Sequence, residues 1–269
     1  MPYAVLFPGQ GSQTPAMRDA VPSGLLARVA ELVGEDPFPR VADSTRFAQP
    51  AIFCASVAGW RRVQAERGAP VAAAGHSLGE LAALVAADAV DVGDALRLVV
   101  LRGALMAGAG GGTMLALLGA DDDRAAALAA SHGVSVANFN APRQVVLSGD
   151  ERALDAVAAA ARDEGLKAMP LGVAGAFHSP AMEPAVEPFA RALRATAWRE
   201  PAFPVISCAS AEPMTDPARE LAAALTAPVR WTDTVRALAA LGADDFVDAG
   251  PGRVLAKLVR RTVPEAAHA

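Results

Sequence analysis

Short apolar runs alternate with longer helical patterns along most of the chain, and this alternation constrains the fold more than any other feature. Residues 3–7 (YAVLF) and 70–76 (PVAAAGH) are typical of buried strands, whereas residues 49–66, 78–89 and 92–109 have helical patterns. Such an order predicts a parallel sheet covered by helices. With 269 residues, 53% hydrophobic and 20% charged, the chain can bury one large core, with or without a smaller insertion.

The rhythm changes after the glycine-rich stretch 108–112. Strand-like runs at 113–119, 134–142, 144–150 and 167–173 are separated by helical patterns at 122–133 and 151–165. This βαββαβ order predicts a ferredoxin-like subdomain of residues 113–173. It is inserted in an α/β-hydrolase-like large domain of residues 1–112 and 174–269. The large domain continues with strands at 204–210 and 244–250 and a helix at 252–263, and residues 264–269 are expected to be a frayed tail.

Charge and cysteine content exclude several classes of protein. The net charge is −5 and no basic block occurs, so we expect no nucleic-acid partner. The N-terminal run lacks a basic region, which favours a first strand over a signal peptide. No apolar run approaches the ~20 residues of a membrane span. Cys54 and Cys208 lack metal-ligand spacing and are typical of packed thiols in a reducing compartment, so we expect a cytoplasmic protein without a metal site.

A serine framed by two glycines lies between the strand at 70–76 and the helix that follows. Gly75 and Gly79 stand two residues before and after Ser77. This pattern is that of a nucleophile elbow, in which a tight turn brings the backbone too close to its neighbours for a Cβ atom. A helix beginning at Leu78 would supply an N–H group and the positive end of its dipole to a developing oxyanion.

A nucleophilic serine needs a base, and the chain has only four histidines. His76 adjoins Ser77, so its side chain is predicted to point away from the hydroxyl. His132 lies in a turn at a helix end and His268 in the tail. Elimination leaves His178 as the candidate general base.

Arg102 is placed unusually for a charged residue. It lies four residues after Leu98 and three before Leu105, on an apolar stripe of its helix. A guanidinium in that setting needs an anionic partner. The partner is either a structural carboxylate or a substrate carboxylate held by two hydrogen bonds, and the pattern alone leaves both open.

Seven motifs in order resemble the malonyl-CoA:acyl carrier protein transacylase family, which includes the acyltransferase domains of polyketide synthases. They are FPGQGSQ, GHSLGE, LRGALM, NFNAPRQVVLSG, GAFHSPAM, APVRW and DAGPGRVL. The resemblance implies that Ser77 is the acyl nucleophile, His178 its base and Arg102 the clamp for a malonyl carboxylate. It also implies an oxyanion hole from the backbone N–H groups of Gln10 and Leu78. Gly9, His76 and Asn140 would bind substrate, with Asn140 along the acyl-CoA entrance.

Two details refine the resemblance. Phe177 in GAFH resembles malonyl-selective members, in which a bulky residue beside the base leaves little room for an α-methyl group. Several members have a glutamine whose main-chain carbonyl orients the catalytic histidine, and the matching position here is Ala224. Because a carbonyl does that work, alanine can replace glutamine. The expected machinery is a Ser–His dyad without an acidic third member.

The family's reaction moves a malonyl group from malonyl-CoA to the phosphopantetheine thiol of an acyl carrier protein, with no bound cofactor. The compact connection 39–50 resembles free-standing acyltransferases that serve polyketide synthases in trans, and a role in fatty acid synthesis is equally compatible. We expect a monomer with basic contacts to an acidic carrier. Two alternatives are an editing acyl hydrolase, which Arg102 disfavours, and a non-catalytic docking subunit, which Ser77 and His178 disfavour.

Overall fold

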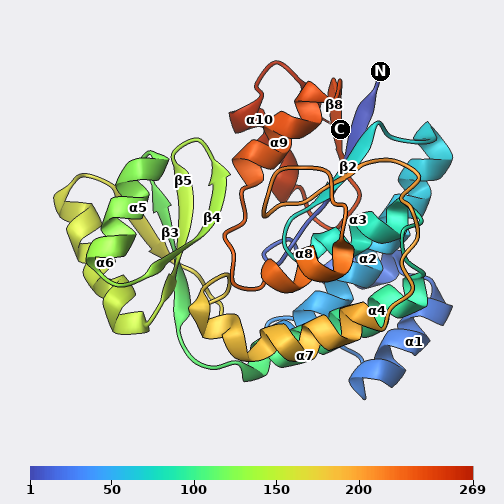
Figure 1. Ribbon diagram of the computed structural model, residues 1–269, viewed down its shortest axis with the longest axis horizontal. Coiled ribbons are helices and arrows are strands. Elements are labelled where there is room, and N and C mark those ends of the chain that lie inside the picture. The colour runs from blue at the N-terminus through green and yellow to red at the C-terminus, as the bar shows by residue number, and fades with distance from the viewer. Residues whose placement is uncertain (269) are drawn as a thin grey trace.

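The computed structural model describes residues 1–268 and contains two sheets, each at the centre of one part of the molecule. In Figure 1 the larger part lies to the right and the smaller, green-to-yellow part to the left. The larger part is built on a five-stranded sheet of order β7-β2-β1-β8-β9, in which all neighbours are parallel. Its strands are β1 (Tyr3–Phe7), β2 (Ala72–Gly75), β7 (Val205–Ile206), β8 (Asp245–Asp248) and β9 (Ala267–His268).

Helices cover both faces of this sheet, as alternate side chains of β1 show. Val5 and Phe7 belong to the core shared with α2 (Thr45–Arg67), α3 (Gly79–Ala86) and α4 (Val92–Gly108). Ala4 and Leu6 belong to the core shared with α9 (Trp231–Ala240) and α10 (Val254–Thr262). Burial on both faces explains why the strands are continuous apolar runs and not alternating ones.

The remaining helices complete the large part. The α-helices are α1 (Ser23–Val33), α7 (Glu183–Arg194) and α8 (Pro217–Ala223), and short 3-10 turns span Pro15–Ala20, Phe38–Arg40 and Pro180–Met182. Helix α7 packs against α4 and α8. The sequence patterns above single out neither these three helices nor α9.

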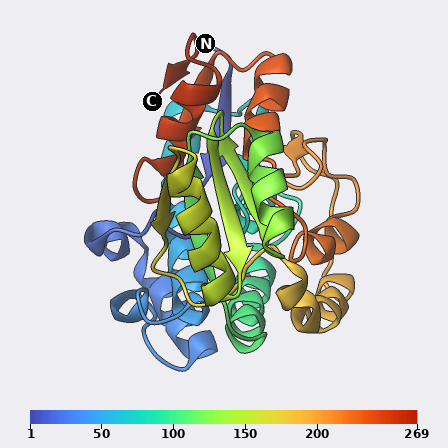
Figure 2. The same cartoon turned by 90° about the vertical axis from the view of Figure 1, so that its left-hand side faces the viewer.

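The smaller part has the predicted βαββαβ order. It comprises β3 (Thr113–Leu118), α5 (Asp122–Ser131), β4 (Ser135–Ala141), β5 (Gln144–Gly149), α6 (Glu151–Asp163) and β6 (Lys167–Pro170). The strands form an antiparallel sheet of order β4-β5-β3-β6, and Figure 2 shows α5 and α6 on its outer face. The ferredoxin-like fold is therefore confirmed, while the boundaries 113–173 stay a prediction. On the inner face, Met114, Ala137 and Val146 join the core of the large part.

Several strands, among them β2, β6, β7 and β8, are shorter than predicted, and three further segments differ in other ways. Helix α2 begins at Thr45 instead of 49, because the Ser44 side chain accepts a hydrogen bond from the Arg46 N–H and caps an extra turn ahead of Pro50. Helix α3 begins at Gly79, with Leu78 as its cap residue. In the tail predicted to be frayed, residues 267–268 pair with β8, whereas Ala269 lies outside the described residues.

Within residues 1–268, no helix combines the length and apolarity needed to cross a membrane. The same residues contain no group of three His, Cys, Asp or Glu side chains that could hold a metal ion. Cys54 and Cys208 are both buried free thiols.

Candidate active site

The turn between β2 and α3 holds Ser77 in a left-handed conformation, with φ of 55°. Both flanking glycines are required by close backbone approaches. A Cβ atom on Gly75 would lie 1.9 Å from the carbonyl carbon of Gly79, and one on Gly79 would lie 2.0 Å from the carbonyl oxygen of Phe7. These distances are far below van der Waals contact, so the strand, turn and helix can pack this closely only around glycine. The structure therefore has the strand–turn–helix geometry of a nucleophile elbow.

His178 lies opposite this serine. Its Nε2 atom is 2.8 Å from Ser77 Oγ, and its Nδ1 atom is 3.0 Å from each of the carbonyl oxygens of Ala224 and Ala227. Since a carbonyl can only accept, Nδ1 must carry the ring proton. In the neutral ring Nε2 is then an acceptor, and the Ser77 hydroxyl donates to it. The backbone thus selects the tautomer that a general base needs.

Burial keeps the His178 ring neutral. The pKa of His178 is lowered to about 3, first by burial and then by the positive charge of Arg102 and the neighbouring His76, while the two carbonyls act in the opposite direction. A ring with so low a pKa is uncharged at neutral pH and keeps its lone pair for the Ser77 proton.

Arg102 extends from α4 to the other side of Ser77. It is 5% exposed; its Nη1 donates to Gln49 Oε1 at 2.7 Å and its Nη2 to Ser77 Oγ at 3.0 Å. Among the described residues, no carboxylate forms an ion pair with this guanidinium. Burial lowers the pKa of Arg102 to about 10, opposed by Glu80 and Cys208, so the group stays charged at neutral pH. A buried cation without an ion pair beside a serine hydroxyl is suited to an anionic ligand.

Two buried polar residues near this arginine escaped sequence reasoning. Gln49 is fully buried and orients the guanidinium, and its one signal was a polar residue within the apolar run FAQPAIF. Glu80 is 1% exposed, and its Oε1 accepts from the Cys208 N–H at 2.8 Å. Burial raises the pKa of Glu80 to about 7, although hydrogen bonds from Cys208 and the charge of Arg102 act to lower it.

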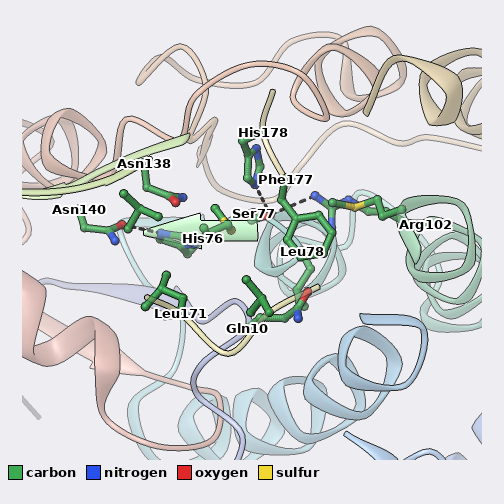
Figure 3. Close-up of a pocket in the computed structure, with 14 residues that line it drawn as sticks. Gln10, His76, Ser77, Leu78, Arg102, Asn138, Asn140, Leu171, Phe177 and His178 are labelled. Atoms are coloured by element: carbon green, nitrogen blue, oxygen red, sulfur yellow. Dashed lines mark hydrogen bonds between the residues drawn. The ribbon is translucent and has the colours of Figure 1, made fainter. Parts of the chain in front are cut away.

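The pocket above Ser77 is a cavity of about 140 Å³ between the two parts of the molecule (Figure 3). His178 lies on one side of Ser77 and Gln10 on the opposite side, with Arg102 to the right and His76 and Asn140 to the left. The remaining lining residues are Leu78, Met106, Met114, Asn138, Val146, Leu171, Val173 and Phe177. Asn138 is a further lining residue that the sequence analysis did not select.

The other predicted site residues surround this pocket. His76 Nε2 lies 2.9 Å from Asn140 Oδ1, so its ring points away from the Ser77 hydroxyl as expected. Gly9 does not line the pocket; a Cβ atom there would lie 2.8 Å from the His76 carbonyl oxygen, so glycine allows the β1 and β2 loops to meet. Phe177 is buried at the pocket wall.

The two remaining histidines are remote from the pocket lining. His132 caps α5 in the small part, where its Nδ1 lies 3.0 Å from the Leu128 carbonyl. Residue 268 pairs with β8 at the sheet edge. Within the described residues, His76 and His178 are thus the histidines that line the site, and only His178 contacts Ser77.

Comparisons of the whole chain with known proteins show what it is similar to. The chain is 37% identical to the polyketide biosynthesis protein ThaF of Burkholderia thailandensis, over 99% of this chain but only 25% of that protein. It is also 37% identical to the malonyl CoA-acyl carrier protein transacylase of Escherichia coli K12, over 97% of this chain and 93% of the relative. A solved malonyl-transacylase in complex with its type II polyketide acyl-carrier protein, PlMCAT:AntF, superposes with a TM-score of 0.93 at 34% identity, covering 100% of this chain and 95% of that one.

Residues 23–269 match the family described as the acyl transferase domain. The match includes Ser77, Arg102 and His178, and the relatives align with nearly the whole chain. The chain therefore belongs to the acyl transferase domain family.

Proposed function

We propose that the protein moves a malonyl group from malonyl-CoA to the phosphopantetheine thiol of an acyl carrier protein, through a malonyl ester on Ser77. The observation that carries the proposal is the buried guanidinium of Arg102, which has no ion pair among the described residues and lies 3.0 Å from Ser77 Oγ. The names of the E. coli relative and the PlMCAT:AntF complex support the same reaction.

The first half of the reaction acylates Ser77. His178 Nε2 takes the hydroxyl proton while Oγ forms a bond to the thioester carbon, and the carbonyl becomes an oxyanion. The tetrahedral intermediate collapses, the carbon–sulfur bond breaks, and His178 gives the proton to the departing coenzyme A thiolate, which leaves as the thiol. In the second half the carrier's thiol gives its proton to His178 and its sulfur attacks the ester carbon. The bond from that carbon to Ser77 Oγ then breaks, and His178 returns the proton to Oγ.

The backbone N–H groups of Gln10 and Leu78 hold the oxyanion in both halves. Both residues line the pocket beside Ser77. Among residues 1–268, neither N–H has a hydrogen-bond acceptor of its own. Leu78 also precedes the first turn of α3, whose dipole favours negative charge at this end.

Arg102 makes the pocket selective for acyl groups that carry a carboxylate. A malonyl carboxylate can accept hydrogen bonds from the guanidinium, whereas an acetyl group would leave the buried charge unpaired. Leaving such a charge without its partner costs about 3 kcal/mol, or roughly a hundredfold. Phe177 narrows the pocket against an α-methyl group, and Asn140 lies along the route by which the thioester arm enters.

A carboxylate on Arg102 also helps the base. The guanidinium charge is one cause of the low pKa of His178. When the substrate carboxylate neutralises that charge, the ring becomes a stronger base at the moment when it must take the Ser77 proton. Ala224 and Ala227 then accept from the imidazolium through Nδ1, in place of an acidic third residue.

The wider setting of the enzyme follows from the reaction. We infer that the chain works in the cytoplasm as a monomer without a bound cofactor, and that its protein partner is an acidic acyl carrier protein. Its relatives include a polyketide biosynthesis protein and a malonyl CoA-acyl carrier protein transacylase. The proposed reaction is therefore compatible with supply of malonyl units in trans to a polyketide synthase and with fatty acid synthesis. An editing hydrolase is disfavoured, because an apolar acyl chain would meet the Arg102 charge.

Intact-protein mass spectrometry tests the proposal directly. The protein is mixed with malonyl-CoA, and a carrier protein bearing phosphopantetheine is added afterwards. We expect a malonyl adduct on Ser77 that moves to the carrier, and no adduct on a Ser77→Ala variant. A parent protein that forms no adduct, or loses it to water equally fast with and without carrier, would refute the transferase and favour the hydrolase.

A further inference from the structure

A chain of hydrogen bonds leads away from the carboxylate-binding guanidinium toward the loop of Gln10. Arg102 Nη1 donates to Gln49 Oε1 at 2.7 Å, and Gln49 Nε2 donates to Thr45 Oγ1 at 2.8 Å. The Thr45 hydroxyl in turn donates to Gln10 Oε1. The chain thus crosses from α4 to the first turns of α2 and then to the loop after β1.

The three hydrogen bonds all run the same way, with each residue donating to the next one toward Gln10. Arg102, Gln49 and Thr45 are 5%, 0% and 5% exposed, so water cannot readily replace the bonds between them. Aligned hydrogen bonds polarise one another, and a buried group that loses its partner pays the full cost of desolvation. The orientation of the guanidinium and the position of the Gln10 side chain are therefore linked.

Thr45 lies where two helices approach each other closely. A Cβ atom on Gly103, next to Arg102, would lie 3.0 Å from the Thr45 carbonyl oxygen, so α4 and the start of α2 are in close backbone contact here. Beyond Thr45, Gln10 borders a second cavity of about 600 Å³, lined by the 41–45 segment and the 171–174 segment. Without the Thr45 hydroxyl, the Gln10 amide has room to turn into that cavity.

We infer that Thr45 is a positioning residue that links the carboxylate clamp to the oxyanion loop. The inference rests on the proposed function, in which Arg102 binds the malonyl carboxylate and the Gln10 N–H binds the oxyanion. By holding Gln10 from one side and Gln49 from the other, the hydroxyl fixes both ends of the site in the geometry of the reaction. Its effect belongs to the rate of acylation more than to the binding of malonyl-CoA.

Thr45→Val tests this link, because valine keeps the shape of the side chain and removes the hydroxyl. Rapid-quench acylation of Ser77 is measured with malonyl-CoA and, separately, with acetyl-CoA. We expect the saturating rate constant for malonyl to fall roughly tenfold, with the half-saturating concentration within about twofold of the parent. The rate constant for acylation by acetyl-CoA should fall only about threefold. The acetyl group has no carboxylate for Arg102 to bind, so it depends only on the oxyanion hole at Gln10.

Two further variants separate positioning from folding. Thr45→Ser restores the hydroxyl and should recover both rates. Thr234→Val is the matched control, since Thr234 is also buried and its hydroxyl donates to the Arg230 carbonyl at 2.9 Å, in α9. It should leave both rates unchanged. Gln10→Ala keeps the backbone N–H but removes the side chain that Thr45 holds. In that background Thr45→Val should no longer change the rate of acylation by acetyl-CoA.

The outcomes distinguish this inference from the proposed function. Parent-like rates in Thr45→Val, or equal losses for malonyl and acetyl that Thr45→Ser does not recover, would overturn the positioning role. Failure of the proposed function would already be visible in the parent protein, which would take no malonyl group onto Ser77.

Discussion

Ser77 Oγ lies 2.8 Å from His178 Nε2, and the two residues share an uncommon backbone conformation, with φ of 55° and 57°. Neither is glycine, so each holds its left-handed turn at a steric cost. The cost is offset by packing around them. Gly75 and Gly79 fix the serine turn, and the Ala224 and Ala227 carbonyls fix the histidine ring. Both partners of this hydrogen bond therefore have a strained backbone, which indicates that the surrounding structure holds them in place so that the bond can form.

Replacing Arg102 should change which acyl group the enzyme prefers. In Arg102→Ala, malonyl acylation of Ser77 should fall by roughly a hundredfold or more, because its carboxylate would enter a buried site without a counter-charge. Acetyl acylation should be unchanged or faster. Competition between malonyl-CoA and acetyl-CoA, followed by mass spectrometry, measures the ratio. Arg97→Ala is the control, since Arg97 is exposed on the same helix and pairs with Asp94. An unchanged acyl preference in Arg102→Ala would return that arginine to a structural role.

The pH dependence of acylation should report on His178. The base acts when deprotonated, so the rate falls as pH drops through its pKa. Burial and Arg102 hold that pKa at about 3 in the free protein, and the acylation rate should therefore show no His178 titration above about pH 5. Removing the positive neighbour raises the pKa, so Arg102→Gln with acetyl-CoA should lose rate at a higher pH than the parent does. Identical acid limbs for the two proteins would contradict a charge effect of Arg102 on the base.

The sequence contained enough to locate the chemical centre but not its supports. Ser77 was found from the spacing of two glycines, and His178 from the elimination of other histidines. Gln49 and Thr45 were missed because their partners come from α4 and the β1 loop, and such contacts depend on how helices pack. Ala227 carries only a backbone carbonyl to the site, which no side-chain pattern can reveal. Glu80 resembles an ordinary acidic residue in the first turn of a helix, so its burial was hidden.

Glu80 should make the protein less stable as the pH rises. Its pKa is about 7 in the folded protein, against 4.5 for an ordinary glutamate, so between these values the folded state holds a proton that the unfolded state has released. The free energy of unfolding must fall across that window and level off above it. The full effect is up to about 3 kcal/mol.

Glu80→Gln removes this dependence while its amide oxygen can still accept from Cys208. The free energy of unfolding is measured by urea denaturation at pH 5 and pH 8. Relative to the parent, the variant should be more stable at pH 8 than at pH 5. Arg102, Cys208 and Glu220 are the groups that influence this carboxyl, and they are unchanged in the variant. Glu212→Gln, at an exposed site, supplies the control and should follow the parent at both values. A variant that tracks the parent would show that Glu80 titrates normally.

The elbow glycines should tolerate no larger residue. In Gly79→Ala the new Cβ would lie 2.0 Å from the Phe7 carbonyl oxygen, and because that atom belongs to the central strand it cannot move aside without disturbing the sheet. We expect a loss of about 3 kcal/mol or more in the free energy of unfolding, measured by urea denaturation. Gly24→Ala is the matched control. Gly24 is also helical, in α1, but a Cβ there meets nothing within 4 Å. It should gain up to about 1 kcal/mol from helix propensity. If both variants were equally stable, close backbone contact would not be the reason for glycine at the elbow.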